Sequence, residues 1–266
     1  MTTQSAPKPL AGWRVLVPRG GPWGDQVAAL LRAKGAQPVV APMINFAPTD
    51  DAPALEAALG RLAAGDFDWL TITSATTVDV LSSHRAVVAP GTRIAAVGET
   101  TAAALVAAGY HVDIVPSDDN SAGGLLAEWE SATKGQVPLK VLTLRSEIAK
   151  PLLTEGLRRI GHDVESVVAY RTIGVPVDPS VVEQVSDGRV QAVLVTSGSV
   201  ANQVQEQLGP IPESVIVACI GPQTAKDAEA CGLRVDVIAD ERSGESLIDA
   251  LVRAANPAHR GHGAEL

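Results

Sequence analysis

Residues 95–115 read AAVGETTAAALVAAGYHVDIV, and residues 218–238 read ACIGPQTAKDAEACGLRVDVI. In both stretches a short apolar run leads through a glycine into a helix-forming segment, and a second glycine precedes the next apolar run. The glycines of the first stretch, Gly98 and Gly109, recur 123 positions later as Gly221 and Gly232. This alternation predicts repeated strand–helix–strand units, which fold as α/β domains with parallel sheets.

The repeat extends beyond these two stretches. Thr73-Ser74 recurs at Thr196-Ser197 with the same offset, and VLVPR (15–19) matches VLTLR (141–145) at an offset of 126. A shared α/β architecture alone produces similar patterns of glycines and helices, but near-constant offsets over several landmarks favour a true duplication. We therefore expect two copies of one flavodoxin- or Rossmann-like unit.

Short apolar runs mark the expected strands, and helix-length segments with an apolar stripe lie between them. Because these runs are continuously apolar, the sheets are expected to be covered by helices on both faces. Four glycines lie where a helix ends and a strand follows, the position at which a left-handed residue is common. The expected strands are 15–17, 69–72, 93–97, 112–115, 141–144, 164–170, 192–195, 215–220 and 235–238, and the glycines are Gly35, Gly109, Gly161 and Gly232.

Composition restricts the classes of function. Hydrophobic residues make up 46% of the chain but aromatic residues only 3%, which predicts an aliphatic core. The net charge of −9 without a basic patch argues against nucleic acid or an anionic membrane surface as a partner. Cys219 and Cys231 are interpreted as buried free thiols of a reducing compartment. With neither a signal-peptide pattern nor a long apolar run, we expect a soluble cytoplasmic protein with flexible tails at 1–9 and 256–266.

The common catalytic and cofactor motifs are missing. RGGPWG (19–24) lacks the G-x-G-x-x-G spacing, no Walker lysine follows a glycine loop, and TSGSV (196–200) is not a nucleophile elbow. The five histidines fall at element ends (His84, His111, His162) or in the tail (His259, His262) and are interpreted as surface residues. We expect no metal and no other cofactor.

Hydroxyls and arginines follow the predicted strands at the turns into helices. Ser and Thr often serve only as helix caps there, and Pro222 suits a first helical position. In open α/β sheets, however, ligands bind outside the carboxyl ends of the strands, where backbone N–H groups favour anions. The predicted substrate-binding residues are Arg19, Ser74, Thr76, Gly98, Thr100, Thr101, Arg145, Ser197, Ser199, Gly221 and Thr224.

Taken in order, these motifs resemble those of uroporphyrinogen-III synthases. The resemblance covers roughly residues 12–253, and its one noted departure is Ser146, where many relatives have glycine. The resembling segments are VLVPR (15–19), TITSATTVDVL (71–81), IAAVGETTAAAL (94–105), LTLRSEIAKPLLTEGLRRIGHDVESVVAYRT (142–172), VLVTSGSVANQ (193–203), IGPQTAKDAEACG (220–232) and ERSGESLIDAL (241–251).

The resemblance implies two α/β domains joined by a two-stranded linker. A simple tandem duplication would divide the chain near residue 135. On the family pattern, residues 10–43 instead pair with 176–255 to form the first domain, and residues 47–170 form the second. The linkers would be MINFAP (43–48) and AYRTIGVP (169–176).

The resemblance also implies an activity. Members of this family are cofactor-independent, cyclising hydro-lyases of porphyrin and haem biosynthesis. They close hydroxymethylbilane, a linear tetrapyrrole with eight carboxylates, in an interdomain cleft while inverting ring D. The resemblance favours a monomer, and it leaves open a contact with the preceding enzyme of the pathway.

Tyr170 is the predicted catalytic residue, because its match in the family lies by the cleft. Its phenol could donate a hydrogen bond or a proton to the departing hydroxyl. The alternative is a linker tyrosine that packs one strand on another. Thr101 and Thr224 also match cleft-facing positions in the family, with helix capping as the competing interpretation.

Two other classes of function compete with the interpretation as an enzyme. One is a non-catalytic regulatory protein of the same fold that binds a tetrapyrrole or another polyanion; from the short tail after Leu251 we expect no fused DNA-binding domain. The other is a two-lobed binding protein for a sugar or an amino acid, which the scarcity of aromatic residues disfavours.

Overall fold

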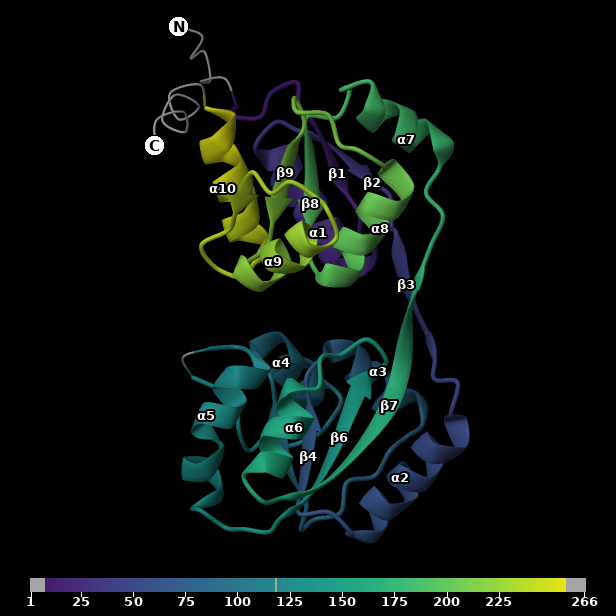
Figure 1. The fold of residues 1–266 in the computed structure, drawn as a ribbon, viewed down its shortest axis with the longest axis vertical. Coiled ribbons are helices and arrows are strands. Elements are labelled where there is room, and N and C mark those ends of the chain that lie inside the picture. The colour runs from purple at the N-terminus through teal and green to yellow at the C-terminus, as the bar shows by residue number, and fades with distance from the viewer. Residues whose placement is uncertain (1–7, 118, 257–266) are drawn as a thin grey trace, which may run out of the picture. The chain divides into compact units, whose positions relative to one another are not determined.

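The computed structural model describes residues 8–117 and 119–256, which form two compact units (Figure 1). The first unit contains the chain up to Asn45 and the chain from Gly174 onward, and the second unit is Phe46–Ile173. The first unit is thus assembled from both ends of the chain. The predicted tails at 1–9 and 256–266, with His259 and His262, fall almost wholly outside the described residues.

The first unit has a five-stranded sheet in the order β10-β9-β8-β1-β2. Neighbouring strands in this sheet are parallel. The strands are β1 (Arg14–Val17), β2 (Gln37–Val40), β8 (Ala192–Val195), β9 (Ile216–Cys219) and β10 (Val237–Ile238), and the helices are α1 (Gly21–Ala33), α7 (Pro179–Ser186), α8 (Gly198–Leu208), α9 (Pro222–Ala230) and α10 (Gly244–Ala255).

The second unit repeats this design, with the sheet order β3-β7-β6-β4-β5. The pairs β7–β6, β6–β4 and β4–β5 are parallel. The strands are β3 (Ile44–Pro48), β4 (Trp69–Ile72), β5 (Arg93–Ala96), β6 (Lys140–Ser146) and β7 (Asp163–Gly174), and the helices are α2 (Ala52–Ala64), α3 (Ala75–Ser83), α4 (Glu99–Ala107), α5 (Ala122–Thr133) and α6 (Leu152–Arg159).

Apolar cores lie on both faces of each sheet, as the continuously apolar strands predict. In the first unit, α1 and α10 pack on one face and α7, α8 and α9 on the other. In the second unit, α5 and α6 pack on one face and α2, α3 and α4 on the other. Each unit is therefore a three-layer sandwich, and the predicted α/β fold class is confirmed.

The duplication is visible in individual hydrogen bonds. The carboxylate of Asp113 accepts the N–H of Ile94 at 2.8 Å. In the other unit, 123 positions later, Asp236 accepts the N–H of Val217 at the same distance. Since two carboxylates tie equivalent strands in the same way, the repeat extends from the sequence to the side-chain contacts.

The four predicted helix-ending glycines have the left-handed conformation, with φ between 88° and 100°. At each of them, the following residue donates its N–H to a carbonyl in the last turn of the helix. A residue with a Cβ is strained in this conformation, so glycine ends these helices without steric cost.

Some predicted strand boundaries were wrong. Residues 112–115 form only an isolated bridge, between Ala95 and Ile114, and 235–238 shorten to β10. Strand β2 was not predicted, because its sequence QPVV contains a glutamine and a proline and lacks a clear apolar run. Each of these two segments contains an aspartate, Asp113 or Asp236, whose carboxylate accepts a backbone N–H of the neighbouring strand. That N–H group is then not available for backbone pairing between the strands.

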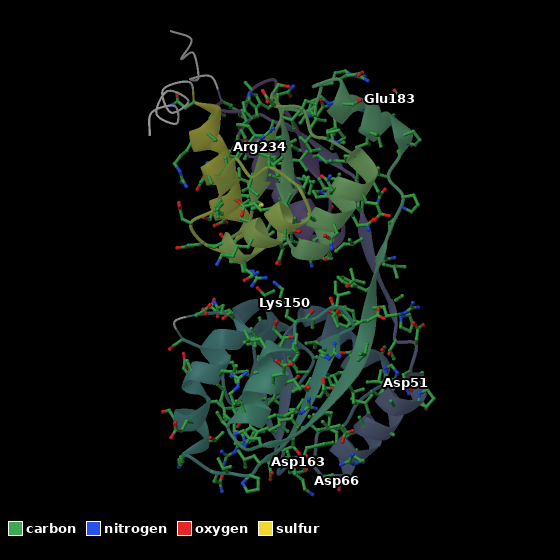
Figure 2. The ribbon with its side chains drawn as sticks, in the orientation of Figure 1. Asp51, Asp66, Lys150, Asp163, Glu183 and Arg234 are labelled. Carbon is green, nitrogen blue, oxygen red and sulfur yellow. The ribbon has the colours of Figure 1, made fainter. Side chains whose placement is uncertain are left out.

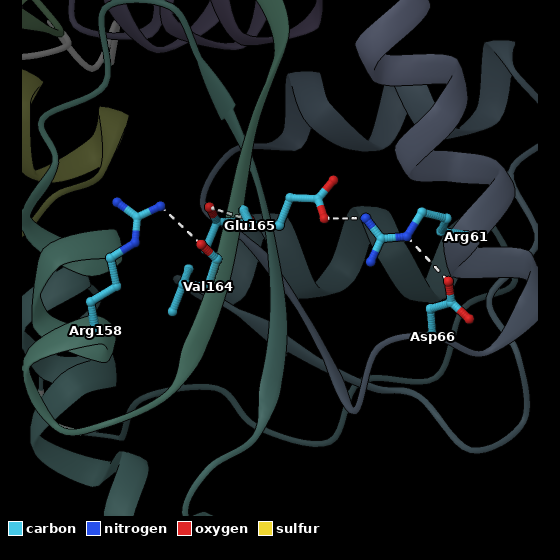
Figure 3. A network of polar contacts seen from close by, with 6 residues as sticks. Arg61, Asp66, Arg158, Val164 and Glu165 are labelled. Atoms are coloured by element: carbon cyan, nitrogen blue, oxygen red, sulfur yellow. Dashed lines mark hydrogen bonds and ion pairs between the residues drawn. The ribbon is translucent and has the colours of Figure 1, made fainter.

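Strand β7 is held on both sides by arginines (Figure 3). Arg61 of α2 binds the carboxylates of Asp66 and Glu165, and Arg158 of α6 donates to the carbonyl of Val164 at 2.8 Å. The bonds to Asp66 and then to Glu165 raise the pKa of Arg61. Because the ion pairs of Arg61 are exposed, their contribution to stability is small.

His162 corrects the expectation that the histidines are surface residues. Its ring is buried, and the indole N–H of Trp129 donates to its Nε2 at 2.8 Å. The N–H of Leu139 faces its Nδ1 at 3.2 Å. Burial lowers the pKa of His162, so the ring is neutral at neutral pH. A neutral imidazole accepts a hydrogen bond at only one of its two nitrogens. We assign Nε2 as the acceptor because its contact is the shorter of the two.

The two cysteines are free thiols. Cys219 is buried, and burial raises the pKa of its thiol to about 12. Cys231 is only partly buried, which corrects the prediction that both are buried. No helix among the described residues is both long enough and apolar enough to span a bilayer.

Candidate active site

Each sheet has one point where the chain changes direction. In the second unit the chain runs from β4 to β5 and then crosses to β6 on the other side of β4. In the first unit the corresponding neighbours are β8 and β1. Doubly wound α/β proteins bind ligands at this switch point, outside the carboxyl ends of the two strands. The residues that follow β4, β6, β8 and β1 are therefore the first candidates.

Ser74 and Arg145 flank the switch point of the second unit. Ser74 caps α3, and its Oγ accepts the N–H of Thr76 at 3.1 Å. The guanidinium of Arg145 turns back on its own strand end: Nε donates to Ser166 Oγ at 3.1 Å and Nη1 to the carbonyl of Ser146 at 3.0 Å. Arg145 is thus held in one orientation before any ligand binds.

Tyr170 joins these residues from the adjacent strand β7. Its backbone is paired with Ser146, and its phenol donates to Ser74 Oγ at 3.0 Å. The ring is 6% exposed and packs edge-on against Phe46, with centroids 5.4 Å apart. The structure therefore brings Ser74, Arg145 and Tyr170 together at one end of the sheet.

The switch point of the first unit has a similar composition. Ser197 caps α8 by accepting the N–H of Val200 at 3.3 Å, and its Oγ lies 2.9 Å from Ser199 Oγ. Arg19 follows β1, with its guanidinium carbon 5.6 Å from the ring centroid of Trp23. One serine cap and one arginine thus occur at the switch point of each unit.

The remaining predicted residues follow β5 and β9, one strand away from the switch points. Gly98 and Gly221 occupy the cap positions of α4 and α9. Thr101 and Thr224 lie in the first turns of these helices and are only 5% and 4% exposed, whereas Thr100 is exposed. Neither threonine is the cap residue, so capping does not explain their presence; their role in substrate binding remains a prediction.

Several hydroxyls at the strand ends have no hydrogen-bond partner among the described residues. These are the fully buried Thr77 in the first turn of α3, Ser146 beside Tyr170, and Thr196 at the end of β8. Thr77 is informative because its equivalent in the first unit, 123 positions later, is Val200. Val200 is also fully buried, so the same helix position accepts an apolar side chain of the same shape.

We expect Thr77→Val to stabilise the protein by about 1–3 kcal/mol, because it removes a buried hydroxyl that binds no atom in the described part of the chain. The reverse exchange, Val200→Thr, is the matched control and should destabilise by a similar amount. Urea unfolding of both variants checks this, provided that the m-value is unchanged. A loss of stability in Thr77→Val would show that its hydroxyl is satisfied in solution.

Charged residues lie at both ends of the second unit. Asp66 and Asp163 lie at one end of the unit, near the amino ends of the strands, and Lys150 lies at the opposite end, after β6 (Figure 2). Arg145 lies near the same end of β6 as Lys150, with Glu147 between them in sequence, and the two cations suit an anionic ligand. Within residues 8–117 and 119–256, no three His, Cys, Asp or Glu side chains are grouped as metal ligands would be.

Three residues of this site were not predicted as members. Phe46 supports the ring of Tyr170, Ser166 holds Arg145, and Ser146 pairs with the backbone of Tyr170. Phe46 and Ser166 carry no sequence signal for these roles, because each contact joins segments from different parts of the chain. For Ser146, the replacement of a common family glycine was the only indication.

Fold and turns together define a duplicated, doubly wound α/β protein with hydroxyls and an arginine at both switch points. A family model described as uroporphyrinogen-III synthase HemD matches residues 25–249. The chain belongs to this family, and the resemblance noted in the sequence is confirmed.

Individual relatives agree with this assignment. The uroporphyrinogen-III synthase of Synechococcus elongatus is 28% identical over 263 residues, covering 92% of this chain and 97% of that protein. The porphyrin biosynthesis protein HemD of Ruminiclostridium josui is 27% identical over 253 residues, covering 92% of this chain but only 49% of that protein. The chain thus spans about half the length of the second relative and nearly all of the first.

The fold also matches a solved structure. A mutant uroporphyrinogen III synthase of the extremely thermophilic bacterium Thermus thermophilus aligns with a TM-score of 0.62 at 20% identity, covering 91% of this chain and 98% of that one. At this identity the likeness supports the fold.

Proposed function

We propose that the protein is a uroporphyrinogen-III synthase, which cyclises hydroxymethylbilane to uroporphyrinogen III with inversion of ring D and release of water. The observation that carries the proposal is the family match over residues 25–249. The two switch points, each with a capping serine and an arginine, support it independently.

The strand-end turns of both units are proposed to bind the carboxylates of the substrate. Backbone N–H groups at the starts of α3 and α8 favour anions through their orientation and the helix dipole. Hydroxyls of Ser74, Thr76, Ser197 and Ser199 add donors, and Arg19 and Arg145 add charge-assisted bonds. Such a distributed set suits a substrate with many carboxylates on a protein whose net charge is −9.

The chemistry demands positioning more than a strong catalyst. Loss of the terminal hydroxyl yields an electrophilic azafulvene, which the substituted carbon of the last pyrrole attacks to give a spiro intermediate that fragments and closes again. Pyrrole carbons are already nucleophilic, so the protein contributes by holding one conformation and by excluding water. The hydrogen-bonded pair Tyr170–Ser74 is proposed to supply the proton donor to the departing oxygen.

The experiment is an isomer analysis. The protein is added to freshly made hydroxymethylbilane, the product is oxidised, and the porphyrin isomers are separated. We expect predominantly the type III isomer. Formation of type I alone, at the rate seen without protein, would contradict the proposal and favour a non-catalytic tetrapyrrole-binding regulator of the same fold.

We further propose that the protein acts in the cytoplasm as a monomer. Its two unpaired cysteines are typical of a reducing compartment. Light scattering coupled to size exclusion tests the oligomeric state, and the same column with the preceding pathway enzyme tests a contact between the two.

A further inference from the structure

The phenolic proton of Tyr170 is already used within the second unit. The hydroxyl donates to Ser74 Oγ at 3.0 Å, and the ring is buried in the apolar core of the second unit, edge-on to Phe46 of β3. A phenol has a single proton to donate. As long as this bond holds, Tyr170 cannot donate the same proton to a substrate.

Ser74 is the residue whose proton remains available. Its Oγ accepts the O–H of Tyr170 and also the N–H of Thr76 at 3.1 Å. A serine hydroxyl has two acceptor lone pairs and one proton, so both acceptor positions are occupied and the proton is left to donate. Two donors on one oxygen also polarise its O–H bond and make it a better donor.

The first unit shows what this arrangement adds. Ser197, the equivalent of Ser74, accepts the N–H of Val200, and its second contact is the hydroxyl of Ser199 at 2.9 Å. Either of these two serines can be the donor, so the direction of the bond is not determined. Of the two capping serines at the switch points, Ser74 is the one whose second hydrogen bond has a fixed direction, because a buried tyrosine donates to it.

We propose that Ser74 is the hydroxyl that donates to an oxygen of the substrate, and that Tyr170 is a positioning residue that acts through Ser74. This inference rests on the proposed synthase function and assigns its second-unit donor. Removal of the phenol leaves Ser74 with a free lone pair and a hydroxyl free to rotate. Its proton is then no longer directed to the substrate, and turnover falls although Ser74 is intact.

The test is a double-mutant cycle with Ser74→Ala and Tyr170→Phe, measured as kcat and KM for hydroxymethylbilane. Each single variant is expected to lower kcat by about a hundredfold, the usual effect of losing one directed donor. The double variant should be no slower than Ser74→Ala alone, because Tyr170 has nothing left to position. Effects that multiply, to about 10⁴-fold, would overturn the proposal and make Tyr170 a donor in its own right.

The matched control pairs Tyr170→Phe with Ser197→Ala. Ser197 belongs to the first unit, and its hydroxyl bonds to Val200 and Ser199 of that unit, so here the two effects on kcat should multiply. If Ser74→Ala does not fold, Ser74→Gly takes its place in the cycle, because glycine is an accepted cap residue. Ser74→Thr should retain most of the wild-type kcat and its dependence on Tyr170.

Failure of this inference is distinguishable from failure of the proposed function. A wild-type protein that forms no type III isomer refutes the function itself. A wild-type protein that forms it while the Ser74 and Tyr170 effects multiply refutes only the assignment of roles. An unfolding free energy of Tyr170→Phe close to that of the wild type separates loss of turnover from loss of structure.

Discussion

Trp129→Ala is expected to lower the free energy of unfolding of the second unit by about 3–5 kcal/mol, the usual range for removing a buried aromatic side chain. Trp129 is a fully buried residue of α5, and its ring centroid is 5.2 Å from that of Trp69. In a chain with only 3% aromatic residues, the surrounding aliphatic side chains cannot fill the space that an indole leaves. The change also removes the donor that His162 Nε2 accepts, which leaves a buried acceptor unpaired.

Urea unfolding followed by far-UV circular dichroism measures the loss, and hydrogen exchange assigns it to one unit. Trp129→Phe is the control that separates the two causes, because it removes the N–H donor while keeping most of the volume. It should cost less than the alanine variant. A loss below about 1 kcal/mol in Trp129→Ala would mean that the cavity collapses completely and that the indole contributes little.

The parts of the fold that were predictable are those encoded by neighbouring residues. Continuous apolar runs identified β1, β4, β6 and β8, because buried central strands need apolar side chains on both faces. Gly109 and Gly232 identified helix ends, because their conformation excludes most other residues. The duplication made each of these assignments twice, which strengthened the prediction of two α/β units.

The parts that were not predictable depend on distant contacts. The strand β2 forms because β1 offers its edge, not because QPVV is a strongly strand-forming sequence. His162, which lies between α6 and β7, is buried because Trp129 of α5 supplies a donor. The partner strand of β2 and the donor to His162 cannot be recognised from neighbouring residues in the sequence. Local periodicity therefore missed β2 and predicted an exposed His162.

The candidate site shows the same division. The positions of Ser74 after β4 and of Arg145 near the end of β6 were predicted, since residues that follow a buried apolar run lie at the carboxyl edge of the sheet. The direction of the side chains was not. The phenol of Tyr170 points to Ser74, and Arg145 folds back on Ser146, so both are engaged inside the unit before a ligand arrives.

Gly124→Ala is expected to destabilise the second unit by about 1–3 kcal/mol or more, as overpacking against an unyielding neighbour does. Gly124 lies in the first turn of α5, and a Cβ there would be 2.0 Å from the backbone oxygen of Asp119. A backbone carbonyl cannot rotate away as a side chain can. Either the turn at Asp119 or the start of α5 must therefore move, and α5 is the helix that carries Trp129.

The adjacent glycine gives the control with the opposite sign. A Cβ at Gly123 would meet its nearest atom, Ser121 Oγ, at 3.4 Å, which is an ordinary contact. Alanine is favoured over glycine in a helix by up to about 1 kcal/mol, so Gly123→Ala should be neutral or stabilising. The urea unfolding midpoints of the two variants test this prediction. Equal shifts would mean that the carbonyl of Asp119 moves to accommodate the new methyl group. Opposite shifts would show that Gly124 is required by close backbone contact and not by flexibility.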